Sequence, residues 1–228
     1  MPRKMLQTAG STVPAAADNS SSGLLVIGGT GPSPARLLEY ASGAGFVVAA
    51  DSGLDSCVAA GVVPDLVVGD MDSLSDPALL GRFPADRVLV FPRDKDETDT
   101  EIGLRILHER GWRHVTIAGG AGGRLDHLLG VAGLFERETP PVRWITGSED
   151  LLLVSGEVEF LGWAGSTVSI FPVGDRAAEL HSEGLKWPLD GLEIRRGFCG
   201  ISNVAETDRV LIRVGFGKLL VVHSFEWT

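Results

Sequence analysis

Hydrophobic residues follow two different patterns along the chain, and the pattern changes near residue 147. Before this point, short runs of Val, Ile and Leu alternate with stretches in which apolar residues recur every three or four positions. Near-continuous apolar runs are typical of strands buried on both faces, whereas a 3.6-residue period indicates helices. Strands are therefore predicted at residues 24–28, 46–50, 65–69, 87–91, 114–119 and 142–146.

Between these runs lie four segments with helical periodicity, which predict helices at residues 33–44, 53–61, 99–111 and 126–138. An alternation of strands and helices predicts a mostly parallel sheet, here a Rossmann-like α/β domain. We expect this domain to span residues 23–147. Residues 1–22, which are rich in Ala, Ser and Thr, are expected to form a flexible N-terminal tail.

After residue 147 the helical period disappears. The apolar runs become β-rich and are separated by glycines, which predicts a smaller all-β domain, a sandwich, at residues 148–228. The runs lie at residues 151–162, 166–173, 191–197, 209–215 and 218–227.

Acidic residues follow the predicted parallel strands at their carboxyl ends. Asp51 follows one strand, and Asp70 and Asp72 follow the next. The segment "DKDETDTE" (94–101) follows a third strand and holds five acids in eight residues. Alone, such a segment is usually a solvated surface. Because ligands of open α/β sheets bind at the carboxyl ends of the strands, acids on neighbouring strand ends favour a shared site instead.

A group of carboxylates at one edge requires a balancing charge. Two carboxylates about 5 Å apart repel by roughly 3 kcal/mol at an effective dielectric constant of about 20. Because all candidate ligands are oxygens, Mg²⁺ or Mn²⁺ is expected and zinc is not. Within the acidic segment, Asp96 or Asp99 is expected to point toward the metal. Thr98 is expected to cap the following helix, and Glu97 and Glu101 to face solvent or the helix start.

A glycine-rich loop, "GGAGGRLDH" (119–127), follows the fifth predicted strand and opens a helix. Gly122 and Gly123 allow backbone N–H groups to approach an anion, and the helix N-terminus favours negative charge. Arg124 can bind phosphate or a carboxylate through two N–H groups. The loop matches neither the Walker A pattern nor the dinucleotide fingerprint. A second loop, "GGTGPS" (28–33), is a weaker candidate of the same kind.

Taken together, the motifs resemble those of the thiamine pyrophosphokinase family. The resemblance is carried by "GDMDS" (69–73), by the acidic segment and the glycine-rich loop, and by "GLKWPLDG" (184–191) and "GISN" (200–203). It implies an α/β catalytic domain, a β-sandwich and a homodimer. It also implies ATP-dependent transfer of pyrophosphate to thiamine, with Mg²⁺, giving thiamine diphosphate and AMP.

The resemblance also implies roles for residues of the α/β domain. Asp70, Asp72 and Asp99 correspond to the metal ligands, with Asp96 close by. Arg124 and Asp126 correspond to residues that meet the substrate and the phosphates. Either Asp99 or Asp126 suits the role of general base.

Three residues of the predicted β domain match the family as well. Trp187 corresponds to a tryptophan that packs on the thiamine pyrimidine across the dimer interface, although its pattern suits a core position equally. Ser202 and Asn203 correspond to a pair beside the substrate. Asp51 and Gly53 are retained in a loop, "ADSGLD", that departs from the "DGGAN" of many relatives, so its nucleotide contacts are open.

Composition restricts the possible partners. The chain has 228 residues and a net charge of −10, which argues against nucleic acid as a partner. It contains neither a long apolar run nor an apolar secretory segment, so a membrane partner is not expected. Cys57 and Cys199 form no CxxC motif, and both are expected to be buried free thiols in a reducing cytoplasm.

Three alternative functions stay open at this point. A Mg²⁺-dependent phosphohydrolase would use the same acids with water as the acceptor. A non-catalytic protein would bind thiamine or a nucleotide without turnover. A third alternative keeps the same transfer of pyrophosphate but has a related pyrimidine or thiazole alcohol as the acceptor.

Overall fold

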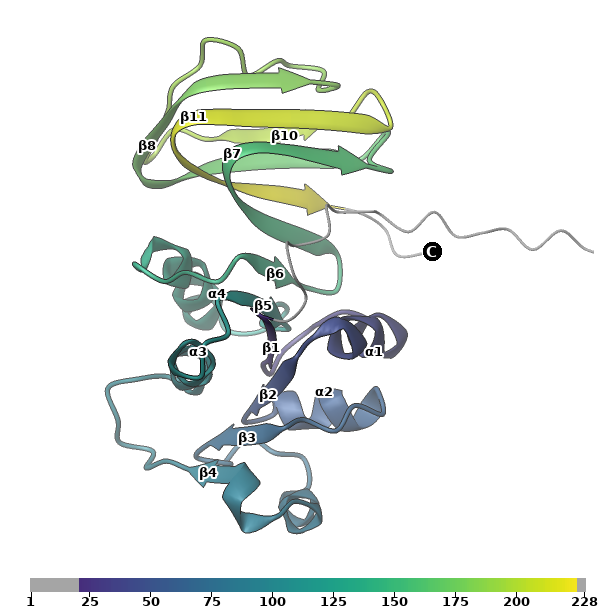
Figure 1. Cartoon of the computed structure of the whole chain (residues 1–228), viewed down its shortest axis with the longest axis vertical. Coiled ribbons are helices and arrows are strands. Elements are labelled where there is room, and N and C mark those ends of the chain that lie inside the picture. The colour runs from purple at the N-terminus through teal and green to yellow at the C-terminus, as the bar shows by residue number, and fades with distance from the viewer. Residues whose placement is uncertain (1–20, 225–228) are drawn as a thin grey trace, which may run out of the picture. The chain divides into compact units, whose positions relative to one another are not determined.

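The structure, a computed structural model, describes residues 21–224 and divides them into two compact units (Figure 1). The first unit ends at Leu153 and the second begins at Val154. Residues 1–20 of the predicted tail lie outside the described residues, and the first strand already begins at Ser22. The three-part division predicted from the sequence (1–22, 23–147 and 148–228) stays a prediction.

The first unit contains a parallel sheet in the order β4-β3-β2-β1-β5-β6. At the β6 edge, the first residues of β7 (Glu149–Leu161) pair antiparallel with β6. Each of the strands predicted before residue 147 is confirmed. The parallel strands are β1 (Ser22–Val26), β2 (Phe46–Ala50), β3 (Leu66–Gly69), β4 (Val88–Val90), β5 (His114–Ala118) and β6 (Arg143–Ile145).

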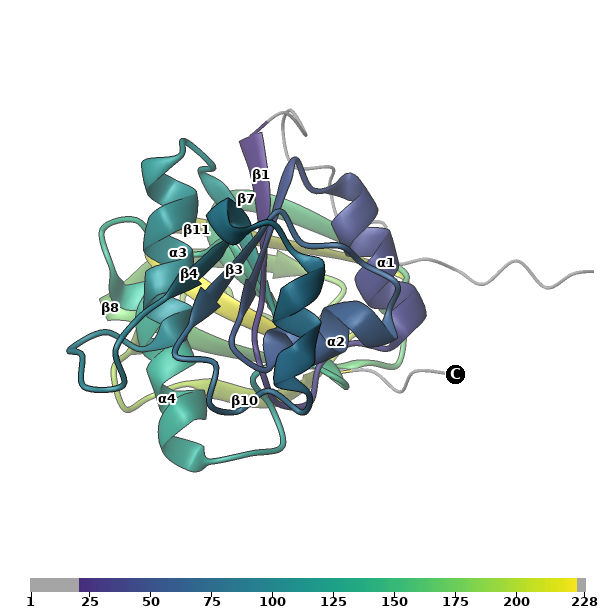
Figure 2. The ribbon, with the colours of Figure 1, turned by 90° about the horizontal axis from the view of Figure 1, so that it is seen from below.

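Helices pack on both faces of this sheet, with α1 and α2 on one face and α3 on the other (Figure 2). Because side chains alternate along a strand, Leu24 and Val26 join the core beneath α1 and α2. Leu25 faces α3, where a Cβ atom on Gly103 would lie 2.5 Å from its Cδ1. Gly103 therefore lets α3 approach the sheet closely. The helices are α1 (Pro34–Gly43), α2 (Gly53–Ala59), α3 (Asp99–Glu109) and α4 (Leu125–Gly133).

Short 3₁₀ helices are where the structure departs from the predicted helices. The predicted helix 126–138 ends at Gly133, and its last part forms η4 (Leu134–Glu136). Two further elements, η2 (Pro77–Arg82) and η3 (Ala85–Arg87), lie between β3 and β4 and were not predicted. They are too short to show a hydrophobic period, although Asp76 accepts a bond from Ala78 N as a cap of η2.

The second unit is β-rich and antiparallel, in the order β10-β8-β11-β7 with β9 paired to β8. Two strands predicted at 209–215 and 218–227 form one strand, because a bulge at Gly217 continues the pairing. Residues 225–227 of the second prediction lie outside the described residues. The strands are β8 (Thr167–Glu183), β9 (Ile194–Arg195), β10 (Gly200–Val204) and β11 (Arg209–Ser224).

The strand order of the first unit creates a topological switch point. From β1 the chain adds β2, β3 and β4 on one side, and then returns to place β5 on the other side of β1. Loops that leave the carboxyl ends of β1 and β5 therefore run toward opposite sides of the sheet, and such a switch point is the usual ligand position in open α/β sheets.

The cysteines are free thiols, as predicted. Cys57 lies on the buried side of α2, and burial raises the pKa of its thiol to about 12. Cys199 is partly exposed, so the expectation of two buried thiols fails for this residue. Among the helices that the structure describes, none has the length and apolar character needed to cross a membrane.

Candidate active site

Three carboxylates converge at the carboxyl edge of the parallel sheet. They belong to Asp51 after β2, Asp70 after β3 and Asp99 at the start of α3, and one oxygen of each lies within 4.8 Å of the others. A search of residues 21–224 finds this set as a possible metal site. We call it the carboxylate group.

The backbone around the carboxylate group is adapted to this close approach. Gly69 ends β3 with a φ angle of 140°. A Cβ atom here would lie 3.2 Å from Asp99 Cγ and 3.3 Å from Asp51 Cβ. Asp51 and Met71 have positive φ angles of 47° and 64°, which non-glycine residues rarely adopt. Such backbone strain is often found at functional sites.

Asp72 supports the carboxylate group from outside. Its backbone N–H donates to Asp70 Oδ1 at 3.2 Å, and its own carboxylate pairs with Arg93 and accepts a bond from Ser73 Oγ at 2.9 Å. The sequence predicted Asp70, Asp72 and Asp99 as metal ligands, whereas the geometry groups Asp51 with Asp70 and Asp99. The signal for Asp51 was its position directly after the strand beside β3.

Lys95 is the cation inside the carboxylate group. Its Nζ lies 3.2 Å from Asp99 Oδ1 and 3.6 Å from Asp70 Oδ2. It also donates to the carbonyl oxygen of Pro92 at 3.0 Å. Asp96, the next residue, is exposed and is not a member of the group. The role of Lys95 was not predicted from the sequence, because only the acids of residues 94–101 were considered as members of the site.

The pKa values within the group move in opposite directions. Burial raises the pKa of Asp99, and the negative charges of Asp70 and Asp51 add to this, while Lys95 opposes it. Burial also raises the pKa of Asp70, but the Asp72 backbone N–H and the Lys95 ammonium outweigh it, so that this pKa lies below its ordinary value. A stronger positive charge would stabilise the ionised form of each carboxylate.

The donor set fits a hard divalent cation. All three candidate ligands are carboxylate oxygens, which Mg²⁺ prefers, and they belong to three different loops. Asp99 Oδ1 is buried, and among the described residues its partner is the Lys95 ammonium at 3.2 Å. A buried carboxylate oxygen requires a positive partner of this kind, a role that a metal ion can also fill.

A capping box fixes Asp99 as the first residue of α3. Thr98 Oγ1 accepts a bond from Glu101 N at 3.3 Å, and Glu101 Oε2 accepts a bond from Thr98 N at 2.7 Å. The predicted cap at Thr98 is confirmed. The other oxygen of Glu101 pairs with Arg137, and Glu97 pairs with Arg105. Both glutamates therefore hold the helix in place, and neither joins the carboxylate group.

Two glycine-rich loops meet at the switch point between β1 and β5. Thr30 N donates to Ala121 O at 2.6 Å, and Gly120 N donates to Gly28 O at 2.8 Å. The weaker sequence candidate, residues 28–33, thus lies directly against the stronger one. Gly122 has a φ angle of 70°, and a Cβ atom there would lie 2.3 Å from Thr30 Oγ1.

Gly53 and Gly123 differ in their surroundings. Gly53, at the start of α2, is buried, and a Cβ atom there would lie 2.1 Å from the carbonyl oxygen of Val26. It therefore allows α2 to start against β1, beside the loop that carries Asp51. Gly123 is exposed, and a Cβ atom there would meet nothing within 4 Å.

Arg124 and Asp126, at the start of α4, bind each other. Arg124 Nε donates to Asp126 Oδ1 at 3.1 Å, and His127 N donates to the same oxygen at 3.0 Å. The hydrogen bond from Arg124 lowers the pKa of Asp126. Both side chains are exposed, and Asp126 is not a member of the carboxylate group. The geometry therefore leaves their predicted roles toward substrate as predictions.

In the second unit, the structure brings together Trp187, Ser202 and Asn203. Trp187 N donates to Asn203 Oδ1 at 3.1 Å, and Asn203 Nδ2 donates to Trp187 O at 2.7 Å. Ser202 has a φ angle of 62°, and its N–H donates to Ser169 Oγ at 3.1 Å. Trp187 is 54% exposed, so it is not a core residue, and the Lys186 ammonium lies 4.7 Å from the centroid of its ring.

Two family models match the chain. The thiamin pyrophosphokinase catalytic domain matches residues 37–140, and the thiamin pyrophosphokinase vitamin B1 binding domain matches residues 156–220. The chain belongs to the thiamin pyrophosphokinase family. Both matched segments contain the residues just described, the carboxylate group in the first and Trp187 with Asn203 in the second.

Individual relatives within the thiamin pyrophosphokinase family are distant. The thiamine pyrophosphokinase of Bacillus subtilis (strain 168) is 27% identical over 185 residues, which cover 78% of this chain and 86% of that protein. Thiamine pyrophosphokinase 2 of Arabidopsis thaliana is 28% identical over 164 residues, which cover 65% of this chain. This match spans only 61% of the Arabidopsis protein.

Solved thiamin pyrophosphokinase structures share the fold over nearly their whole length. The enzyme of Geobacillus thermodenitrificans has a TM-score of 0.70 at 29% identity and covers 90% of this chain and 99% of its own. The Bacillus subtilis structure has a TM-score of 0.76 at 23% identity, with 90% of this chain and 100% of its own covered. The predicted fold class, an α/β domain followed by a β-rich domain, is confirmed.

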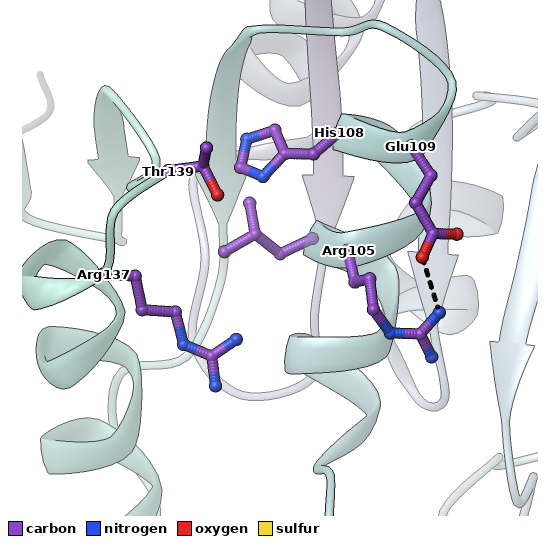
Figure 3. Close-up of a pocket in the computed structure, with 6 residues that line it drawn as sticks. Arg105, His108, Glu109, Arg137 and Thr139 are labelled. Carbon is purple, nitrogen blue, oxygen red and sulfur yellow. Dashed lines mark hydrogen bonds and ion pairs between the residues drawn. The ribbon is translucent and has the colours of Figure 1, made fainter.

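A cavity of about 410 Å³ lies beside the outer part of α3, away from the predicted site residues (Figure 3). Its arginines are already paired, Arg105 with Glu97 and Glu109, and Arg137 with Glu101. Burial and nearby Arg113 lower the pKa of His108. The lining residues are Leu104, Arg105, His108, Glu109, Arg137 and Thr139.

The capping box at the start of α3 gives a first testable prediction. We expect Thr98→Ala to destabilise the protein by about 1 kcal/mol and to lower Tm by roughly 2–4 °C, because Glu101 N loses its acceptor. Thermal denaturation followed by circular dichroism in the presence of a chelator measures this. Thr98→Ser keeps the hydroxyl and should match the wild type. Equal Tm values for Thr98→Ala and the wild type would contradict the role of the cap.

Proposed function

We propose that the chain transfers the pyrophosphoryl group of ATP to the hydroxyl of thiamine, giving thiamine diphosphate and AMP. The observation that carries this proposal is the carboxylate group beside two glycine-rich loops at the switch point, in a chain of the thiamin pyrophosphokinase family. In this reaction the thiamine oxygen bonds to the β-phosphorus of ATP. The bond from that phosphorus to the oxygen bridging the α- and β-phosphates breaks, and AMP leaves.

The carboxylate group is the proposed Mg²⁺ site. Asp70 and Asp99 are the ligands that sequence and geometry both support, Asp72 is retained from the sequence, and Asp51 is added from the geometry. Bound Mg²⁺ supplies neutralisation of the charge on the phosphate oxygens. The protein contributes fixed carboxylates on three loops, and their positions need little rearrangement when the substrate binds.

The loops supply the proposed contacts to ATP. The exposed residue Gly123, with Gly122 and the start of α4, suits the phosphates, and Arg124 can exchange its bond with Asp126 for a phosphate oxygen. Asp126, released in this way, or Asp99 can then accept the hydroxyl proton of thiamine. Asp51, Gly53 and Asp96 are further predicted contacts to the nucleotide.

The second unit supplies the proposed thiamine site. Its exposed indole at Trp187, held by Asn203 beside Ser202, suits stacking and cation–π contact with a cationic aromatic substrate. We propose that a homodimer brings this indole to the α/β domain of the other subunit. The free thiols suit a reducing compartment, and the cytoplasm is the proposed location.

Apolar side chains on both units support the homodimer. On α4, Leu125 and Leu129 are 69% and 60% exposed, and on the second unit Phe198 and Ile201 are 60% and 66% exposed. Large apolar side chains with this exposure are typical of interfaces between proteins.

The reaction is tested by product analysis. Purified protein is mixed with ATP, Mg²⁺ and thiamine, and nucleotides and thiamine phosphates are separated by chromatography. We expect AMP and thiamine diphosphate in equal amounts, and only when both metal and thiamine are present. ADP with thiamine monophosphate, or ATP breakdown that does not depend on thiamine, would contradict the proposal.

Replacement of the acids tests the metal ligands. We expect Asp70→Asn and Asp99→Asn to lower kcat/KM by about 100-fold or more and to weaken Mn²⁺ binding, measured by electron paramagnetic resonance, because each removes a charged ligand. Asp86→Asn, an exposed acid in η3, serves as the charge-matched control. Unchanged Mn²⁺ affinity in Asp99→Asn would exclude this residue as a ligand.

The same measurement separates Asp51 from Asp72. The geometry favours Asp51 as the third ligand, so Asp51→Asn should weaken Mn²⁺ binding more than Asp72→Asn does. Asp72 acts through Asp70 and Arg93, and loss of such outer contacts weakens metal binding by about 10- to 100-fold. The reverse order would return Asp72 to the ligand set.

Light scattering after size-exclusion chromatography tests the homodimer. We expect a wild-type mass twice that of the chain, and a shift toward the mass of one chain for Leu129→Glu, because a charge would be buried at the interface. Val63→Glu is the control, since Val63 is 74% exposed in the loop before β3. A wild-type protein with the mass of one chain at assay concentration would refute the dimer.

A further inference from the structure

Lys95 has an unusual position for a lysine. Its side chain is only 15% exposed, and its ammonium lies between Asp70 and Asp99, which both belong to the carboxylate group. The carbonyl oxygen of Pro92 holds the same ammonium at 3.0 Å. A lysine normally keeps its strongly hydrated charge in water, so this placement requires a gain that offsets the loss of hydration.

The gain comes from the three acids around it. The carboxylates of Asp51, Asp70 and Asp99 lie within 4.8 Å of one another. Among the described residues, Lys95 is the cation that forms ion pairs with this group. Arg93, the other cation nearby, is directed to Asp72 instead. Without Lys95, the carboxylates would repel one another with no positive charge among them.

Lys95 balances this group only in part. One ammonium serves three carboxylates: it lies 3.2 Å from Asp99 Oδ1 and 3.6 Å from Asp70 Oδ2, and none of the described ion pairs joins it to Asp51. A divalent cation bound to the same oxygens would neutralise more charge and would also repel the ammonium. The lysine side chain is flexible, and its ammonium binds anions as a point charge, whereas arginine binds them through a planar pair of N–H groups. Its ammonium can therefore leave without unfolding the loop.

We propose that Lys95 is an internal counter-ion that exchanges places with the metal. In the metal-free protein its ammonium holds Asp70 and Asp99 together. When a divalent cation binds these carboxylates, the ammonium leaves them and pairs with the phosphates of ATP. This inference rests on the proposed function, and it identifies Lys95 as the residue that couples metal binding to nucleotide binding.

The exchange has a consequence for the order of binding. A metal ion that arrives alone must displace Lys95 from its two carboxylates and leave the ammonium without an anionic partner. A metal ion that arrives with ATP brings phosphate oxygens that can accept the ammonium. The chain should therefore bind the metal weakly when it is alone and tightly when nucleotide is present. By linkage, the metal should tighten nucleotide binding by the same factor.

Mn²⁺ binding measured by electron paramagnetic resonance, without thiamine, tests the exchange. We expect Lys95→Met to bind free Mn²⁺ about tenfold tighter than the wild type, because no ammonium competes for the carboxylates. A non-hydrolysable ATP analogue should tighten Mn²⁺ binding in the wild type and much less in Lys95→Met. Arg82→Met, which removes an exposed cation from η2, is the control for net charge and should behave as the wild type.

Thermal stability gives a second readout that does not depend on turnover. In a chelator, Lys95→Met should have a lower Tm than the wild type, and Mn²⁺ should restore it. The double variant Lys95→Met/Asp99→Asn should regain part of the loss without metal, because one repelling charge is removed with the lysine. A merely structural lysine would lower Tm in the same way with and without Mn²⁺.

The outcomes separate the exchange from the proposed function. If Lys95→Met binds free Mn²⁺ no more tightly than the wild type, while Asp99→Asn loses binding, the metal site stands and the exchange is refuted. If the wild type and Lys95→Met both fail to bind Mn²⁺, with or without the ATP analogue, the exchange and the proposed metal site both fail. Tighter binding in Lys95→Met together with the loss of nucleotide coupling supports the exchange, whichever acceptor the product analysis identifies.

Discussion

Electrostatic repulsion among Asp51, Asp70 and Asp99 is the constraint on which the rest of the site depends. Their oxygens lie within 4.8 Å of one another, a separation at which each pair of charges repels by about 3 kcal/mol at an effective dielectric constant of 20. The fold withstands this because each acid is fixed by a different rigid element, and because Lys95 lies among them. A stable domain thus contains a local arrangement that a cation would relieve.

The parallel sheet converts sequence order into this arrangement. Strands β2 and β3 are neighbours, so the residues that follow them meet at one edge, and the segment between β4 and α3 brings Asp99, the first residue of α3, to the same edge. The return to β5 then sets the second glycine-rich loop against the first. Glycine-rich loops and acidic side chains come to adjacent strand ends without any long insertion.

Much of the fold was predictable because its signals are local. Buried parallel strands appear as apolar runs, and Thr98 with Glu101 is a recognisable helix start. The polar second half of β8 and the short η2 were not predictable, because neither shows an apolar period. At the site, the sequence identified the acids but not the contacts of Lys95, nor the packing of Thr30 against residues 119–123, since these depend on how separate loops meet in space.

The spacing of the acids depends on a residue with no side chain. Gly69 lies where a single added carbon atom would press on both Asp51 and Asp99, and its φ angle of 140° is one that other residues rarely adopt. The distance between two charged groups is thus set by a position that carries no charge and offers no ligand. A list of site residues based only on their functional groups would therefore omit Gly69, the residue that determines how close Asp51 and Asp99 lie.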